Sequence, residues 1–279
     1  MDMDRQGCIY LCATPIGNLE DVTLRVLRIL READTVAAED TRHTRKLLSH
    51  YDIHTPLVSL HEHNEGERIP GLIAEACEGK VIAVVTDAGM PGISDPGTAI
   101  CRAAREEGVP VTVLPGPSAV LSALVLSGAD SERFTFEGFL PRANAERRER
   151  IASIAGEERT VILYEAPHRV ERTLKALSDA CGADRRVSVV REITKVHEEV
   201  WSGTLAKAVT RAGSEEGFRG ELVLVLAGAE KEEAEWEMDI PDQLRRYIEE
   251  GMDKKEAVKR VARERGLPKS EVYRYSIDL

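Results

Sequence analysis

The stretch VIAVVTDAGMPGISDPG, residues 81–97, decides the fold. Its first six residues are apolar and mostly β-branched, which predicts a strand buried on both faces of a parallel sheet. The loop after Asp87 is built largely from glycine and proline, at Gly89, Pro91, Gly92, Pro96 and Gly97. Ser94 and Asp95 stand where the N-cap of the next helix is expected. Open α/β sheets bind ligands at such places, beyond the carboxyl ends of their strands.

This loop has neither the G-x-G-x-x-G pattern of dinucleotide sites nor the Walker pattern of phosphate-binding loops. Glycines let a ligand approach the backbone closely, and the Asp87 carboxylate could accept a hydrogen bond from a hydroxyl or an ammonium group. An ordinary connection between a strand and a helix would have the same composition. The residues therefore predict a small polar ligand at a strand end and do not identify it.

Strands and helices alternate outward from this loop in both directions. We expect strands at 8–14, 35–38, 57–60, 81–86, 109–114, 134–139, 160–165, 187–193, 197–202 and 221–226. We expect helices at 22–30, from Thr41 onward, and at 66–77, 99–104, 119–126, 144–154, 170–180, 241–250, 254–265 and 269–275. Alternation implies parallel strands with right-handed crossovers. Only 197–202 and 221–226 are expected to run antiparallel, because no helix separates 187–193 from 197–202.

Domain boundaries are expected where proline, glycine or charge interrupts this alternation. The segment Pro115-Gly116-Pro117-Ser118 separates an N-terminal α/β domain, 1–115, from a second α/β domain, 116–228. The acidic stretch 229–238 is expected to be a linker, and 239–279 a small helical extension.

Composition limits the functional classes. The net charge of −11 argues against a protein that coats nucleic acid, although it allows a local basic patch. No segment approaches the roughly 20 apolar residues of a membrane span, and the charged N-terminus lacks the apolar region of a signal peptide. The five cysteines form no C-x-x-C pair. We expect a cytoplasmic protein with no disulfide, no metal site and no membrane contact.

Acidic and basic side chains meet at the end of the predicted strand 35–38. Glu39 and Asp40 end the strand, and four basic or titratable side chains open the next helix: Arg42, His43, Arg45 and Lys46. Such a group suits proton transfer or phosphate binding. The alternative is a capped helix with a solvated face. A helix N-terminus normally prefers acids to cations, which favours the functional interpretation.

Three further constellations follow predicted strands or occupy a predicted helix. The sequence HEHNE, residues 61–65, resembles a metal motif, but His61 and His63 are two residues apart and a third ligand is not evident. The stretch 142–150 carries Arg142, Arg147 and Arg148 and is a candidate phosphate-contacting face, or equally a solvated helix. The end of the strand at 160–165 is the counterpart of the Asp87 loop, and two such ends facing each other would form a cleft.

Seven segments in this order resemble the ribosomal RNA small-subunit methyltransferase I family, within the tetrapyrrole methylase superfamily of class III methyltransferases. They are ATPIGNLEDVTLR (13–25), AAEDTRHTRKLL (37–48), HEHNE (61–65), TDAGMPGISDPG (86–97), PGPSAVLSAL (115–124), GFLPR (138–142) and YEAPHR (164–169). The resemblance covers about residues 8–228, and LPKSEVYR (267–274) resembles the extension of some members. The family's loop commonly reads SDAGTPLISDPG, so Thr86, Met90 and Gly92 depart from it.

The resemblance implies two α/β domains with S-adenosylmethionine between them. It implies 2′-O-methylation of the ribose of a decoding-site cytidine in 16S rRNA of the small subunit, by a homodimer. The cofactor-binding residues carried over are Pro15, Asp87, Ala88, Gly89, Ser94, Pro96, Ser118, Tyr164, Glu165, Ala166, Glu221 and Val223. The expected RNA-binding residues are Arg42, Arg45, Lys46, Arg142, Arg147 and Arg148. Either Glu39 or Asp40 is the candidate base, and Arg42, His43 and Arg45 are expected to hold RNA phosphate near the reacting group.

Two alternatives remain open at this stage. A tetrapyrrole C-methyltransferase of the precorrin type shares the fold and the cofactor. Those enzymes typically carry a G-x-G-x-G-D motif after the first strand, where this chain reads ATPIGNL. A non-enzymatic ribosome assembly factor would require a broken cofactor loop, and this loop keeps Asp87, Gly89, Pro96 and Gly97.

Overall fold

The computed structural model describes residues 6–230 and 238–277. The chain divides into two compact units, Met1–Ala229 and Glu230–Leu279, and each is described by itself. Both contain helices, and none of the helices in the described ranges is long and apolar enough to cross a membrane.

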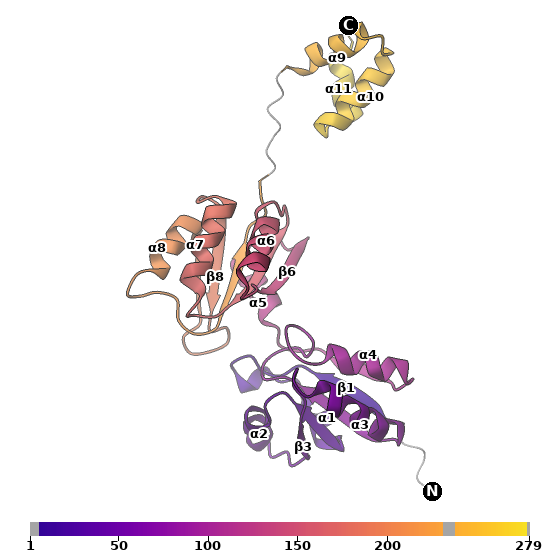
Figure 1. Cartoon of the computed structure of the whole chain (residues 1–279), viewed down its shortest axis with the longest axis vertical. Coiled ribbons are helices and arrows are strands. Elements are labelled where there is room, and N and C mark those ends of the chain that lie inside the picture. Colours follow the sequence, from indigo (N-terminus) through magenta and orange to yellow (C-terminus); the bar gives the residue numbers. More distant parts are fainter. Residues whose placement is uncertain (1–5, 231–237, 278–279) are drawn as a thin grey trace. The chain divides into compact units, whose positions relative to one another are not determined.

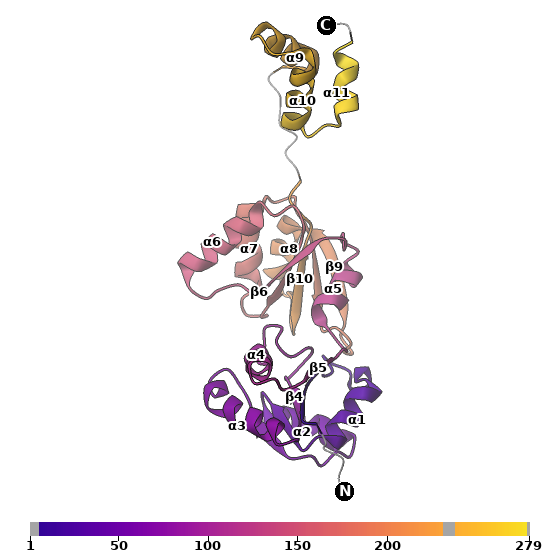
Figure 2. The same ribbon diagram turned by 90° about the vertical axis from the view of Figure 1, so that its right-hand side faces the viewer.

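The first sheet contains the loop-bearing strand at its centre (Figures 1 and 2). Its strands are β1 (Cys8–Cys12), β2 (Thr35–Ala38), β3 (Leu57–Ser59), β4 (Val81–Val85) and β5 (Val111–Leu114). The spatial order is β3-β2-β4-β1-β5, and every neighbouring pair is parallel. All five residues of β4 are buried, as its apolar run predicts.

Helices cover both faces of this sheet. The elements are the short 3₁₀ helix η1 (Leu19–Asp21), α1 (Leu24–Glu32), α2 (Thr41–His50), α3 (Glu65–Cys77) and α4 (Thr98–Glu106). Buried side chains of α1 and α2 form one core with one face of the sheet. Those of α3 and α4 form a second core on the opposite face. Helix α1 begins two residues later than expected, because η1 occupies the preceding segment and Thr23 provides the cap.

The second sheet is mixed rather than parallel. Its strands are β6 (Phe134–Phe139), β7 (Thr160–Glu165), β8 (Arg186–Arg191), β9 (Glu199–Thr204) and β10 (Leu222–Leu226), in the order β6-β7-β10-β8-β9. Only β6 and β7 pair in parallel, and the three pairs that involve β8, β9 and β10 are antiparallel. Because β10 is antiparallel to both β7 and β8, strands β6, β7 and β8 run in one direction and β9 and β10 in the other, which confirms the directions expected from the sequence.

Helices again lie on both faces of the second sheet. They are α5 (Ala119–Ser127), α6 (Asn144–Ala155), α7 (Val170–Cys181) and α8 (Leu205–Ala212). Helices α6, α7 and α8 share one core, and α5 packs on the other face beside Ile16 and Ile193. Helix α8 was not expected, although Thr204 accepts a hydrogen bond from the Lys207 N–H as its cap.

The C-terminal unit consists of three short helices around a core of their own. They are α9 (Ile240–Glu249), α10 (Lys254–Arg265) and α11 (Lys269–Tyr275), which confirms the three helices expected from the sequence. Leu244, Val261 and Val272, one from each helix, are fully buried in this core. Most of the acidic stretch 229–238, which we expected to be a linker, lies outside the described residues.

Candidate functional site

The loop after β4 is fixed to the end of β1 by two backbone hydrogen bonds. The N–H of Thr14 donates to the Gly89 carbonyl at 2.9 Å, and the N–H of Gly89 donates to the Thr14 carbonyl at 3.1 Å. Gly89, Gly92 and Gly97 all have positive φ, which glycine adopts without steric cost. These three glycines are therefore needed for the backbone conformation of the loop itself.

The expected helix cap at Ser94 and Asp95 is wrong. Helix α4 begins at Thr98 with Gly97 as its N-cap, and no side chain caps it. Ser94 instead has a left-handed backbone with φ of 64°, which is uncommon for a residue with a side chain. This conformation leaves both side chains available to a cavity.

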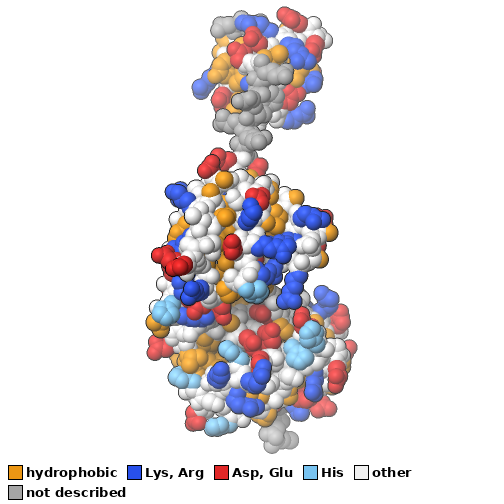
Figure 3. All heavy atoms as spheres, turned by 60° about the vertical axis from the view of Figure 1, so that its left-hand side comes forward, with side chains coloured by type: hydrophobic (Ala, Val, Ile, Leu, Met, Phe, Trp, Pro, Cys, Tyr) orange, Lys and Arg blue, Asp and Glu red, His pale blue; other side chains and the backbone are white. Residues whose placement is uncertain are grey.

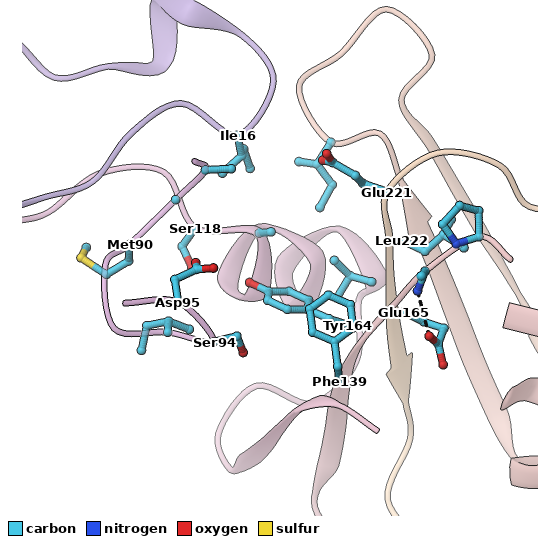
Figure 4. Close-up of a pocket in the computed structure, with 18 residues that line it drawn as sticks. Ile16, Met90, Ser94, Asp95, Ser118, Phe139, Tyr164, Glu165, Glu221 and Leu222 are labelled. Atoms are coloured by element: carbon cyan, nitrogen blue, oxygen red, sulfur yellow. Dashed lines mark hydrogen bonds between the residues drawn. The ribbon is translucent and has the colours of Figure 1, made fainter. Parts of the chain in front are cut away.

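A first cavity of about 340 Å³ lies between the ends of the two sheets (Figure 4). The first half of the unit contributes backbone and side chains from Ile16 and from 88–95, and the second half contributes the ends of β6, β7 and β10. Most of the lining is apolar, from Ile16, Ile93, Phe139, Ile193 and Leu222. This size and composition are typical of a site for a small organic molecule.

Tyr164 forms one wall of the cavity and is held in place by aromatic neighbours. Its ring lies edge-on to Phe136 at 5.0 Å between centroids and tilted against Phe139 at 5.4 Å. Burial and the nearby charge of Asp95 raise the pKa of Tyr164 to about 12, so its hydroxyl stays protonated. Figure 4 shows this hydroxyl and the Asp95 carboxylate pointing toward one another.

Asp95 has the most altered carboxyl group of the site. Burial, followed by the charges of Glu39 and Asp87, raises its pKa to about 7. Burial also raises the pKa of Glu39. Three carboxyl groups from β2, β4 and the loop thus share one region, which favours a positively charged group beside them.

Glu165 lines the cavity but its carboxylate is turned away (Figure 4). It accepts hydrogen bonds from its neighbour Ala166 N–H at 2.8 Å and from the Thr173 hydroxyl, and Arg169 lies 3.4 Å away. Thr173 in turn accepts a hydrogen bond from Arg147 at 2.8 Å. Glu165 is 2% exposed, so it is the buried centre of a polar network below the cavity.

A second cavity of about 310 Å³ adjoins the first and shares Ile16, Ala88 and Glu221 with it. It lies on the side of α2, which contributes His43, Thr44, Lys46 and Leu47. The remaining lining comes from the turn after β1, the end of β4 and Lys195. Two adjoining cavities with different lining residues suit two different ligands.

Lys195 lines the second cavity and is paired with Glu221, which lines both cavities. Its ammonium group lies 3.0 Å from Glu192 and 3.1 Å from Glu221. Burial disfavours its charge, but these two partners outweigh burial and raise its pKa. Glu192 and Thr194, which precede Lys195, have left-handed backbones, and the Thr194 hydroxyl accepts a hydrogen bond from the Asn18 N–H at 3.0 Å. This strained loop therefore joins the two halves beside the cavities.

The two acidic residues after β2 have different environments. Asp40 caps α2 by accepting from the Arg42 N–H at 2.8 Å, and the Arg42 guanidinium holds the pKa of this carboxyl well below its usual range. Glu39 accepts from the Asp87 N–H at 3.4 Å, and the Asp87 carboxylate accepts from the Asp40 N–H at 3.1 Å. As a candidate base, Glu39 is favoured over Asp40.

The structure brings most of the expected cofactor residues together. Nine of them line the first cavity: Ala88, Gly89, Ser94, Ser118, Tyr164, Glu165, Ala166, Glu221 and Val223. Pro15 and Asp87 line the second cavity, and Pro96 lines neither. Sequence reasoning missed Asp95 as a lining residue and missed Lys195 altogether. The proximity of Lys195 to the site depends on the strained loop, which has no sequence signal.

The expected RNA-binding residues divide into three groups. His43, a catalytic candidate, and Lys46 line the second cavity, while Arg42 and Arg45 are exposed on the same helix. Arg142 and Arg148 are exposed near the start of α6. Arg147 is only 6% exposed and faces Thr173 and Glu165, so its expected place on an RNA-contacting surface is wrong.

In the segment HEHNE, residues 61–65, hydrogen bonds hold the local backbone in place. The side chain of Asn64 accepts from the His61 N–H at 2.8 Å and donates to the Ser59 hydroxyl at 3.1 Å. The rings of His61 and His63 are 6.0 Å apart between centroids. Among the residues that the structure describes, no group of three or more His, Cys, Asp or Glu is arranged to hold a metal ion.

Comparison with known proteins gives two levels of similarity. The family model of the tetrapyrrole (corrin/porphyrin) methylases matches residues 8–209. A protein of Halalkalibacterium halodurans named ribosomal RNA small subunit methyltransferase I is 48% identical over 275 residues, covering 97% of this chain and 94% of that protein. A protein of the same name in Synechocystis is 45% identical, and the match covers 98% of this chain and 98% of that protein. One in Bacillus subtilis is 43% identical, and the match covers 96% of this chain and 93% of that protein.

Solved structures share the fold at much lower identity. A uroporphyrin-III-C-methyltransferase of Thermus thermophilus is 22% identical, with a TM-score of 0.55, and the match covers 79% of this chain and 94% of that one. A diphthine synthase is 19% identical, with a TM-score of 0.61, and the match covers 79% and 90%. The chain thus belongs to the tetrapyrrole methylase family and, within it, to the ribosomal RNA small subunit methyltransferase I family of methyltransferases.

Proposed function

We propose that the protein uses S-adenosylmethionine to methylate the ribose 2′-oxygen of a decoding-site cytidine in 16S rRNA of the small ribosomal subunit. The names of the full-length relatives support an rRNA substrate. The observation that carries the proposal is the pair of adjoining cavities, one mostly apolar with a carboxyl group and the other lined by His43 and Lys46. The first suits the methyl donor, and the second suits a nucleotide with its phosphates.

The residues of the first cavity fit S-adenosylmethionine. The apolar walls formed by Ile16, Ile193 and Tyr164 suit an adenine ring, and the positive-φ backbone at Gly89 permits close approach. The pKa of Asp95 is raised first by burial and then by the negative charges of Glu39 and Asp87, and a positive ligand would stabilise its charged form. Ala88 and Met90 also line the cavity, and the Ser118 hydroxyl, which accepts from the Leu121 N–H at 3.5 Å, has a proton to donate to a ligand.

When bound, S-adenosylmethionine supplies an electrophilic methyl group on a positively charged sulfur. The chain contributes mainly position, since holding the reacting groups in line accounts for much of such a rate enhancement. The strained loop at Lys195 and the turn at Asn18 keep the two cavities side by side. Glu39, whose pKa is raised by burial, is the candidate that accepts the proton of the ribose hydroxyl.

In this proposal the phosphate contacts come from exposed cations, and Figure 3 shows Lys and Arg side chains, in blue, spread over one face of the larger unit. Arg42, Arg45 and Lys46 project from α2, and Arg142 and Arg148 add positive charge from the second half of the unit. Arg42 is also paired with Asp40 at 2.7 Å, so it is already oriented. Lysine and arginine contacts to phosphate position RNA without reading its sequence.

We also propose that the protein acts as a homodimer. Helix α5 leaves two large apolar side chains in solvent, with Leu121 53% and Val125 77% exposed. A second copy of the chain would cover them, and apolar surface of this kind is common at homodimer interfaces. Sedimentation velocity of the protein, compared with a Val125→Asp variant, tests this. A monomer at micromolar concentration would contradict it.

A methyl-transfer assay tests the proposed reaction. Labelled S-adenosylmethionine is offered with purified small subunits, with naked 16S rRNA and with a precorrin, and the RNA product is mapped for 2′-O-methylcytidine. We expect label at one decoding-site cytidine. A Lys46→Gln variant should lose activity on RNA, while Lys175→Gln, an exposed lysine on α7, should not.

The outcomes distinguish rRNA methylation from tetrapyrrole C-methylation. Label on the precorrin alone would replace the proposal by tetrapyrrole C-methylation, whose enzymes share the fold. Label on RNA at a base or at another nucleotide would retain the methyltransferase and contradict the acceptor atom. Bound S-adenosylmethionine without label on any of the three would contradict the proposed substrate.

A further inference from the structure

We propose that the exposed face formed by α10 and α11 in the C-terminal unit is a second RNA-binding surface, separate from the two cavities. This inference rests on the proposed function for the kind of partner, RNA. Its basis is the charge, the exposure and the pairing of the side chains on these two helices.

The charge of this segment is opposite to that of the whole chain. Residues 254–277 contain eight Lys or Arg and three Glu, in a protein whose net charge is −11. An excess of five positive charges over two short helices is a local footprint for a polyanion. An acidic protein that binds RNA requires such a local concentration of positive charge.

Three of these cations form a stripe on α10. Lys255, Lys259 and Arg263 follow each other at intervals of four residues and therefore lie on one face of the helix. All three are exposed, and none has an ion pair within the described residues. Unpaired, solvated cations on one face can each meet a phosphate without first breaking an internal contact.

The other exposed flank of α10 is already neutralised by partners in the unit. Arg260 lies 2.9 Å from Glu264 and stacks over the Tyr247 ring of α9 at 4.4 Å. Glu264 also accepts hydrogen bonds from Tyr247 and Gln243. Helix α9 therefore engages the acidic flank, and the basic stripe lies outside these contacts.

Helix α11 adds exposed rings to this positive segment. A three-residue turn after α10 leads into α11, with Gly266 in the left-handed conformation. Only Val272 of this helix is buried, while Tyr273 is 60% and Tyr275 46% exposed. Lys269 and Arg274 lie on the same short helix, and both are exposed without an ion pair.

Cations together with exposed aromatic rings favour RNA over other polyanions. Exposed tyrosines offer stacking surfaces to unpaired bases, and the cations follow the backbone. A membrane would instead require a continuous apolar face, whereas the apolar residues of α10 are buried in the unit's own core. The observations therefore favour single-stranded or loop regions of RNA as the partner.

The test uses the full chain and two matched double variants. Lys255→Gln/Lys259→Gln removes two cations from the stripe, and Arg245→Gln/Arg246→Gln removes two cations of α9 that are paired with Asp242 and Glu250. Each double variant removes two positive charges from the same C-terminal unit. Binding of a fluorescent single-stranded fragment of 16S rRNA is measured by anisotropy from low to high salt.

We expect the stripe variant to bind more weakly and to lower the slope of log Kd against log salt concentration by about 1.4, at roughly 0.7 per phosphate contact on a single strand. The α9 variant should keep the original slope within about 0.3, since its cations are paired. Tyr273→Ala should weaken binding at every salt concentration without changing the slope. In the methyl-transfer assay, the stripe variant should raise KM for the RNA substrate and leave kcat unchanged.

Equal slopes for the two double variants would overturn the proposal. Equal competition by duplex DNA of the same length would overturn the assignment to RNA. Failure of the proposed function looks different, because the unmodified chain would then bind S-adenosylmethionine and methylate no RNA. The anisotropy measurement needs no methyl transfer, so it decides the RNA-binding surface in either case.

Discussion

At the scale of single residues, Asp95 connects the electrostatics of the first cavity to a measurable pH dependence. Its pKa of about 7 means that the carboxyl group is largely neutral at pH 6 and largely charged at pH 8. A positive ligand binds the charged form more tightly. We therefore expect the affinity for S-adenosylmethionine, measured by calorimetry, to rise as the pH increases through 7.

Two controls isolate this effect. Asp95→Asn should remove the rise, because its amide cannot titrate. S-adenosylhomocysteine has a neutral sulfur, so its affinity should change much less over the same range. The same rise in the asparagine variant would assign the titration to another group.

Asp95 also predicts how stability depends on pH. Its folded-state pKa is raised, so between its ordinary value near 4 and about 7 the folded protein holds a proton that the unfolded chain has lost. The free energy of unfolding contributed by this group therefore falls as the pH rises across that window. We expect Asp95→Asn to be more stable than the unmodified protein at pH 8, by chemical denaturation, and to lose this advantage at pH 4.

Glu165 leads to a different prediction, because its carboxylate serves the fold. Replacing it with alanine removes its ion pair with Arg169 at 3.4 Å and the hydrogen bond from Thr173, and it takes away the negative charge that favours the charged form of Arg147. Removing one partner of a buried ion pair typically costs about 3–5 kcal/mol. We expect Glu165→Ala to lose about 3 kcal/mol in urea unfolding. A loss of cofactor affinity with unchanged stability would instead assign its side chain to the ligand.

Arg147 shows how a residue-level prediction failed although a signal was present. As one of the many charged residues of the run RANAERRER, Arg147 was predicted to lie on an exposed face of the helix. Read by helical spacing, it precedes Ile151 by four residues and Ile154 by seven, and all three are buried on one face of α6. Its hydrogen-bond partner Thr173 lies on α7, 26 residues later, and a local sequence pattern does not predict such a contact.

At the scale of elements, replacing a glycine by alanine is expected to have opposite effects in the loop after β4 and in helix α3. Gly97 has φ of 141°, and a side chain there would meet the backbone nitrogen of Gly92 at 2.9 Å. We expect Gly97→Ala to destabilise the protein by more than about 1 kcal/mol and to weaken cofactor binding. Gly71→Ala is the control: it lies in helix α3 with open space around it, so it should stabilise by about 0.5–1 kcal/mol.

The elements themselves were largely predictable, and their pairing was not. Helical periodicity and caps such as Ser118 and Asp40 identify most helices, because these signals are local. Strand β10 lies between β7 and β8, and no signal within 221–226 specifies these neighbours. Likewise, the cap at Gly97 depends on how the loop folds back, so Ser94 and Asp95 were misassigned.

At the scale of the whole molecule, the two compact units have separate cores. Val261 is fully buried in the core of the C-terminal unit, and none of that core's residues belongs to the larger unit. We expect Val261→Asp to unfold the three C-terminal helices and to leave the calorimetric affinity for S-adenosylmethionine unchanged. Loss of cofactor binding in this variant would show that the units depend on each other.

The site as a whole could be predicted only through the order of its motifs. Each strand end alone is compatible with an ordinary loop, and the resemblance of seven segments to a family is what assigned nine lining residues to one cavity. The second cavity and the place of Lys195 in it could not be predicted, because the cavity forms where segments distant in sequence meet.

The central place of β10 has a consequence for synthesis on the ribosome. This strand is the last of its sheet in sequence, yet it separates β7 from β8 and supplies Leu222 and Val223 to the first cavity. The first sheet is complete once Leu114 has emerged, and it can form while the rest is translated. The second sheet must wait, with β7 and β8 unjoined, until Leu226 leaves the exit tunnel. A nascent chain therefore acquires its cofactor cavity only after nearly all of the larger unit has been made.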